Sequence, residues 1–169
     1  IIINNGDDEM KKVLFVINTL GCAGAETALI ELLKSLDEKE YEISLYVLMG
    51  QGEMIDKIPG NVKLLNDHYC KESVLSKQGK QAMIKTVWRT FWKNGDVFGK
   101  FSYIIRTFSA MRSTGKIQPD KILWRVISDG SPRFEETYDL AVAYLEGGST
   151  YYVAEHVKAK KKAAFIHID

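Results

Sequence analysis

An apolar run that leads through a glycine turn into an amphipathic segment constrains this chain more than any other feature. The apolar run covers residues 13–17, the turn 21–26 and the amphipathic segment 27–36. A buried strand, a turn and a helix in this order bring backbone N–H groups and the positive end of a helix to one point. Such a point suits a phosphate or a sugar diphosphate. The order therefore predicts an α/β protein that binds a ligand at the end of its first strand.

Apolar periodicity along the rest of the chain predicts a doubly wound parallel sheet of about five strands in a three-layer α/β/α, Rossmann-like fold. The strands are expected over 12–18, 43–49, 62–65, 138–145 and 160–168. Helices are expected over 25–36, 119–128 and 151–157, with one helical turn at 53–58 and two helices between 78 and 112 that break at 94–96. Residues 163–166 are expected to form a hydrophobic sheet edge through which the chain self-associates.

The domain organisation follows from length and composition. Residues 1–9 are expected to be a tail, and residues 10–169 one domain with a helical, basic and aromatic insertion around 77–129. The strand at 160–168 is expected to be buried on both faces, and such a strand does not usually end a domain, so we expect a fragment of a longer protein. Cys22 and Cys70 have no metal-ligand spacing and are expected to be free thiols in a reducing cytosol.

Charge is distributed unevenly along the chain. Residues 77–116 hold nine Lys and Arg against one acid, Asp96, which leaves 14 basic and 21 acidic residues elsewhere. This asymmetry indicates an anionic surface as partner.

One helix in this basic segment has three interpretations. Lys85, Arg89 and Lys93 are spaced by four residues beside an apolar stripe that includes Trp88 and Trp92. The helix could lie on an anionic membrane, or bind nucleic acid, although no nucleic-acid-binding module matches. In the third interpretation the stripe packs on the sheet and the lysines are solvated.

The opening of the chain resembles that of family 4 glycosyltransferases, which have the two-Rossmann-domain architecture called GT-B. Residues 13–26 read VLFVINTLGCAGAE, and the family commonly has Gly-Gly-Ala-Glu at the end of this loop. Ala23 replaces the first glycine of that quartet, while Gly24, Ala25 and Glu26 match. Residues 138–169 resemble the family's paired strands that end in a histidine segment, whereas 68–135 match nothing.

The resemblance implies the N-terminal, acceptor-side Rossmann domain of a cytoplasmic enzyme, with contact to the inner face of the membrane left open. Such an enzyme moves a sugar from a nucleotide-sugar donor to a hydroxyl of a glycan or lipid-linked acceptor, with retention, in cell-surface or lipid-linked glycan synthesis. It needs no cofactor and no metal. The donor binds mainly to a second domain through two glutamates seven residues apart, and no such domain is present in these 169 residues. We therefore expect half an active site, inactive alone.

Candidate site residues lie at the expected carboxyl ends of strands. They are the turn residues Gly21, Gly24, Ala25 and Glu26, then Glu146 and Gly147, and finally His167 as the catalytic group that the resemblance implies. Each has an alternative without a ligand. Residues 21–26 could be a plain turn, with Glu26 complementing the helix amino end. Glu146 could simply be solvated, and His167 could be a hydrogen-bonded histidine at a strand end. Ser149 and Thr150 are expected to cap the following helix. His68 and His156 are expected to be surface residues, and neither has a partner at metal or triad spacing.

The same residues bear on three other functions. The spacing of Gly21 and Gly24 is not the dinucleotide fingerprint, and no acid ends the second strand, which argues against an NAD enzyme. A non-catalytic nucleotide- or protein-binding module and a GT-B nucleotide-sugar epimerase remain as alternatives.

Overall fold

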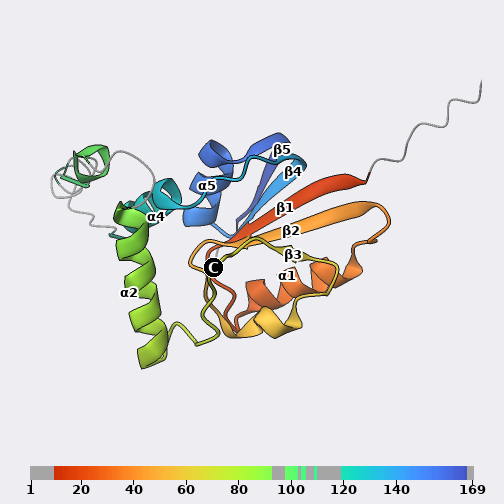
Figure 1. Cartoon of the computed structure of the whole chain (residues 1–169), viewed down its shortest axis with the longest axis horizontal. Helices are drawn as coiled ribbons and strands as arrows, with labels where there is room; N and C mark the ends of the chain where they lie inside the picture. Colours follow the sequence, from red (N-terminus) through yellow and green to blue (C-terminus); the bar gives the residue numbers. More distant parts are fainter. Residues whose placement is uncertain (1–9, 93–97, 103, 106–108, 110–118, 167–169) are drawn as a thin grey trace, which may run out of the picture.

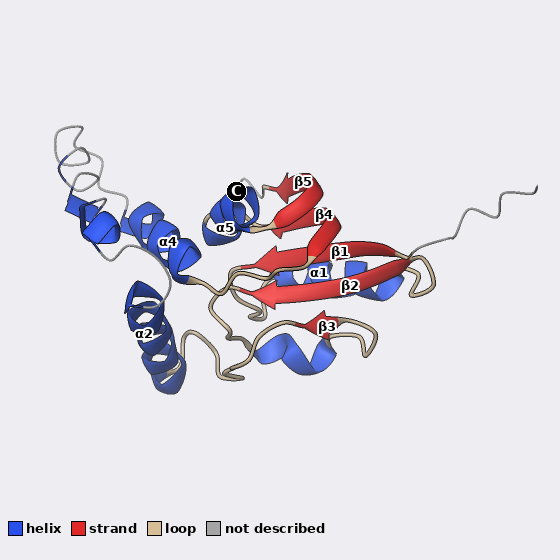
Figure 2. Cartoon of the chain, turned by 45° about the horizontal axis from the view of Figure 1, so that its top comes forward, coloured by secondary structure: helices blue, strands red, loops and turns tan. Residues whose placement is uncertain are grey.

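The computed structural model describes residues 10–92, 98–102, 104–105, 109 and 119–166. Its centre is an all-parallel five-stranded sheet, as the sequence predicts, and the strand order is β3-β2-β1-β4-β5 (Figure 2). The strands are β1 (Lys11–Ile17), β2 (Tyr41–Val47), β3 (Lys63–Leu64), β4 (Thr137–Tyr144) and β5 (Lys158–Phe165).

Helices flank the sheet on both faces. The named helices of the structure are α1 (Gly24–Ser35), α2 (Lys77–Trp92), α4 (Pro119–Gly130) and α5 (Gly148–His156), with a 3-10 helix η1 (Glu53–Lys57). Residues 98–102 are also helical, whereas the expected break at 94–96 and most of the second expected basic helix lie outside the described residues.

Alternate side chains of β1 divide between two apolar cores, which makes the fold three-layered. Val13, Phe15 and Ile17 pack with the buried leucines of α1 on one face. Leu14 and Val16 pack on the other face, with side chains of α4 and α5. The continuous apolar run of β1 thus reflects burial on both faces, as expected for a central parallel strand.

The last strand differs from expectation. β5 pairs with β4 alone, and nearly all its side chains are exposed, including Phe165. The expectation of a strand buried on both faces is wrong here, because side chains on both faces of β5 are exposed. The exposed edge itself is as expected, and self-association through it stays a prediction.

Helices α2 and α4 lie beyond the carboxyl ends of the strands rather than over the sheet (Figures 1 and 2). They pack closely, since a Cβ on Gly130 of α4 would lie 1.8 Å from the carbonyl oxygen of Thr90 in α2. These two helices therefore lie next to the carboxyl ends of the strands, the edge at which the candidate residues lie.

Candidate functional site at the switch point of the sheet

The strand order reverses between β1 and β4, which creates a switch point at their carboxyl ends. The chain leaves β1 into α1 on one face and leaves β4 into α5 on the other. The amino ends of both helices, at Gly24 and Gly148, therefore follow neighbouring strands. Open parallel sheets bind ligands at this position, where two helix ends supply unpaired N–H groups.

The side chain of Asn18 joins the two strand ends. Its Nδ2 donates to the Glu146 carbonyl oxygen at 2.8 Å, and its Oδ1 accepts from the Ser149 amide at 2.8 Å. Asn18 and Ser149 are both buried. The turn after β4 is thus held against the end of β1 by one amide group.

Backbone geometry explains the glycines after β4. Gly147 has a φ of +94°, a left-handed value that side-chain-bearing residues rarely adopt. A Cβ on Gly148 would lie 2.4 Å from Leu48 Cδ2 and 2.8 Å from the Trp124 ring. The fold itself requires glycine at both positions, so their presence does not by itself indicate a ligand.

The glycines after β1 are different. Neither Gly21 nor Gly24 has a positive φ. A Cβ on Gly24 would meet no atom within 4 Å, and one on Gly21 would make only ordinary contacts, the nearest at 3.7 Å. The interpretation that this turn needs glycine for its backbone geometry is therefore wrong. The open space leaves room for a ligand to approach the α1 amides.

The three other candidates of this edge occupy different environments. Ala25 is half-buried in the first turn of α1, and Glu26 beside it is buried, as a carboxylate that complements a helix amino end would be. The Glu146 side chain is exposed at the end of β4. These residues share the switch-point edge, whereas His167 lies outside the described residues.

The expectation that Ser149 and Thr150 cap the last helix is wrong. The helix begins earlier than expected, at Gly148, so both residues lie inside its first turn. Their hydroxyls donate backward to the Leu145 carbonyl oxygen, at 2.6 and 3.3 Å. Leu145, with a φ of +94°, turns the chain so that this carbonyl is within reach.

The apolar stripe of α2 does not pack on the sheet. Ile84, Trp88 and Trp92 are 54%, 60% and 64% exposed. The interpretation of a packed stripe is therefore wrong, because α2 turns the face around Gly79 and Thr90 inward instead. Lys85 and Arg89 flank the stripe and are exposed, and Lys93 lies outside the described residues.

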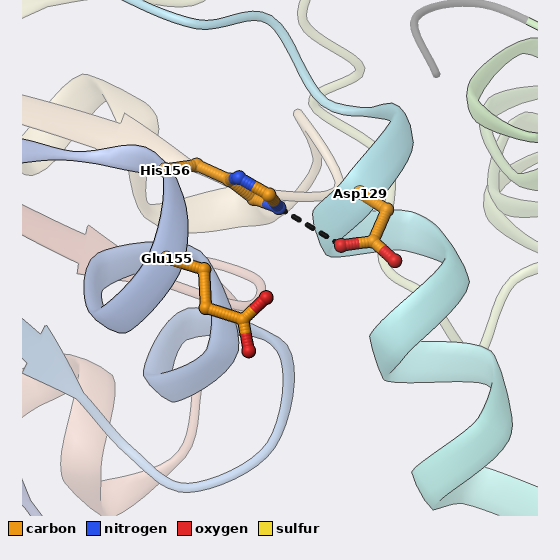
Figure 3. Close-up of side chains that lie close together, drawn as sticks. All are labelled: Asp129, Glu155 and His156. Carbon is orange, nitrogen blue, oxygen red and sulfur yellow. Dashed lines mark hydrogen bonds and ion pairs between the residues drawn. The ribbon is translucent and has the colours of Figure 1, made fainter. Parts of the chain in front are cut away.

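His156 was expected to be a surface residue, and this is wrong. Its side chain is 9% exposed, and Nε2 lies 2.9 Å from Asp129 Oδ1 (Figure 3). Glu155 completes a group whose ligand atoms lie within 4.8 Å of one another. The Arg125 guanidinium already bonds both carboxylates, including 2.5 Å from Nη2 to Glu155 Oε2. We assign this group to joining α4 and α5.

Comparisons of the chain with protein-family models, with curated proteins and with solved structures find no match. None of the described helices has both the length and the apolar content that crossing a bilayer requires.

Proposed function

We propose that this chain is the acceptor-side Rossmann domain of a glycosyltransferase that moves a sugar from a nucleotide-sugar donor to a hydroxyl acceptor. One observation carries the proposal: the turns after β1 and β4, far apart in sequence, meet at the switch point through Asn18. In the proposal, the open α1 amino end at Gly24 faces the donor diphosphate. The amides would stabilise the charge that develops on the leaving group, which is an electrostatic and positioning contribution.

Sequence resemblance supplies the reaction class, and the geometry supports it. The Gly-Ala-Glu of the resembling loop occupies residues 24–26, the first turn of α1. His167 keeps its proposed catalytic role, to orient the transferred sugar or an acceptor hydroxyl. The proposal includes a cytoplasmic location, with the exposed stripe of α2 in contact with the inner face of the membrane.

The test is a mass-spectrometric assay of the complete natural protein with UDP- and GDP-sugars and a panel of glycan and lipid-linked acceptors. Transfer yields a heavier acceptor, whereas an epimerase converts the nucleotide sugar alone and a binding module converts nothing. Gly24→Val should lower kcat/KM about 100-fold, which is the effect of removing one hydrogen-bond donor that stabilises the transition state.

Gly60→Val is the matched control. Gly60 also lacks a positive φ, and its Cβ would meet no atom within 4 Å, but it precedes β3 and so lies at the opposite edge of the sheet. It should keep full transfer activity. Absence of transfer with every donor, or equal activity in the two variants, would contradict the proposal.

A further inference from the structure

A hollow lies beside the switch point, between α2 and the carboxyl ends of β2 and β3. Two adjoining spaces of about 110 and 400 Å³ form it. We call it the α2 hollow, and both spaces share the same four lining residues: Gly50, His68, Thr86 and Arg89. The larger space falls within the size range of small-molecule sites, roughly 300–1,000 Å³.

The walls of the α2 hollow are fixed by the fold. Gly50 has a φ of +58°, and a Cβ there would lie 2.8 Å from the His68 carbonyl oxygen. The Cys70 amide donates to the Gly50 carbonyl at 2.8 Å. Asn66 extends β3 with its side chain, which exchanges two hydrogen bonds with the backbone of Val47 at 2.9 and 2.7 Å. The strand side of the hollow is therefore preformed.

Both ends of α2 are held as well. A Cβ on Gly79 would lie 1.8 Å from the Ser73 carbonyl oxygen, so the first turn packs directly on the preceding segment. At the other end, Lys100 Nζ donates to the Thr90 carbonyl at 2.9 Å, where α2 also meets α4. The side chains of α2 that line the hollow consequently start from a fixed backbone.

Two cationic side chains of α2, Lys85 and Arg89, line the hollow. Lys85 and Arg89 form no ion pair among the residues that the structure describes, whereas cations such as Lys12 and Arg125 are paired. Arg89 presents a planar fork of N–H donors, the geometry that binds phosphate with two hydrogen bonds. Unpaired cations over a preformed hollow favour an anionic group inside it.

The remaining lining groups favour a ligand in which the anionic group is attached to a part that carries several hydroxyls. Asp67 lines the smaller space, and an ionised carboxylate can accept hydrogen bonds from sugar hydroxyls. It repels a doubly ionised phosphate, which has no proton to donate. Burial raises the pKa of Tyr46, another lining residue, to about 12, so it stays uncharged. Two cations and one carboxylate together match a sugar that bears a phosphate better than a bare phosphate.

We propose that the α2 hollow binds a phosphorylated sugar, with Arg89 and Lys85 on the phosphate and Asp67 on the hydroxyls. Leu48 separates this hollow from the switch point: it lines the hollow, and its Cδ2 would lie 2.4 Å from a Cβ on Gly148. A ligand in the hollow thus lies one side chain away from the proposed donor turn. That this ligand is the sugar acceptor rests on the proposed function, whereas its binding does not.

The experiment is an NMR titration of the chain with glucose 6-phosphate, with glucose and inorganic phosphate as separate probes. Glucose 6-phosphate should shift the amides of Asp67, His68 and Arg89, and should bind more tightly than either separate probe. Arg89→Gln combined with Lys85→Gln should weaken binding at least tenfold.

The matched control is Lys77→Gln combined with Lys80→Gln, which removes the same charge from the same helix at positions that do not line the hollow. It should bind within twofold of the parent. Equal weakening in both pairs would mean general charge attraction and would overturn the proposal.

A second titration identifies the source of the sugar phosphate. Phosphatidylcholine vesicles carrying polyprenyl-phosphoglucose are compared with vesicles containing phosphatidylglycerol instead. Tighter binding to the former than to the latter, with the difference lost in the Arg89 and Lys85 pair, assigns a lipid-linked sugar phosphate. Binding of soluble glucose 6-phosphate assigns a soluble one. Failure of both overturns the proposal. Absence of sugar transfer with intact binding would remove only the proposed function.

Discussion

Replacing Asn18 with alanine tests whether one amide group joins the two strand ends. The substitution removes two hydrogen bonds of 2.8 Å, to the Glu146 carbonyl and from the Ser149 amide. Because Asn18 and Ser149 are both buried, water cannot readily replace these bonds. Each buried group left without a partner costs about 1–3 kcal/mol. We expect Asn18→Ala to lower the free energy of unfolding by about 3 kcal/mol.

A loss of this size is measurable by urea unfolding followed by tryptophan fluorescence. In a chain of this length it corresponds to a fall in Tm of about 6–12 °C. Native-state hydrogen exchange gives the local readout, since the Ser149 amide should lose most of its protection. Asn61→Ala is the control, because Asn61 is exposed before β3 and should change stability by less than about 0.5 kcal/mol. An Asn18→Ala protein that matches this control, with Ser149 still protected, would refute the reasoning.

Two further predictions concern the surface. Replacing Trp88 and Trp92 with serine should change the free energy of unfolding by less than about 1 kcal/mol, because both rings are mostly exposed, yet should abolish sedimentation with phosphatidylglycerol vesicles; retained sedimentation would exclude the α2 stripe as the membrane contact. The Lys12 ammonium, 2.7 Å from the Glu136 carboxylate, lowers the pKa of that carboxyl below its usual 4.5, so its stabilisation is present above about pH 4.5 and is lost as the pH falls through the lowered value. Lys12→Met should therefore cost under about 1 kcal/mol at pH 7 and less at pH 3 in urea unfolding. An equal cost at both pH values would exclude the ion pair as its cause.

The positions of central strands could be predicted from the sequence because a strand that is buried on both faces is a continuous run of apolar residues. The continuous apolar run of β1 was placed within one residue, and the glycine turn and α1 followed correctly. Asn18 was missed, although a lone amide side chain directly after a buried strand was a usable signal. Its role depends on β4, which ends more than 120 residues later in the chain. Only the tertiary structure places β4 beside β1.

The α2 hollow could not be predicted because its two walls come from segments that share no local pattern. Periodicity gives α2 and its exposed and packed positions only relative to the helix axis. Where that axis lies is decided by close backbone contacts at Gly79 and Gly130, which look like weak helix positions in the sequence. The same limit explains His156, whose partner Asp129 belongs to another helix.

The charge asymmetry of the sequence acquires a spatial meaning only in the folded chain. Two lysines of β5 lie against acids in or just before β4: Lys160 with Asp139 at 2.7 Å and Lys158 with Glu135 at 2.5 Å. Among the residues that the structure describes, Lys85 and Arg89 have no such neighbour. α2 extends beyond the strand ends, where Asp67 is the one acid among the lining residues of the hollow. The paired lysines are compensated locally, whereas Lys85 and Arg89 remain able to attract an anion over a long range. Increasing salt should therefore weaken ligand binding at the α2 hollow far more than it weakens the fold.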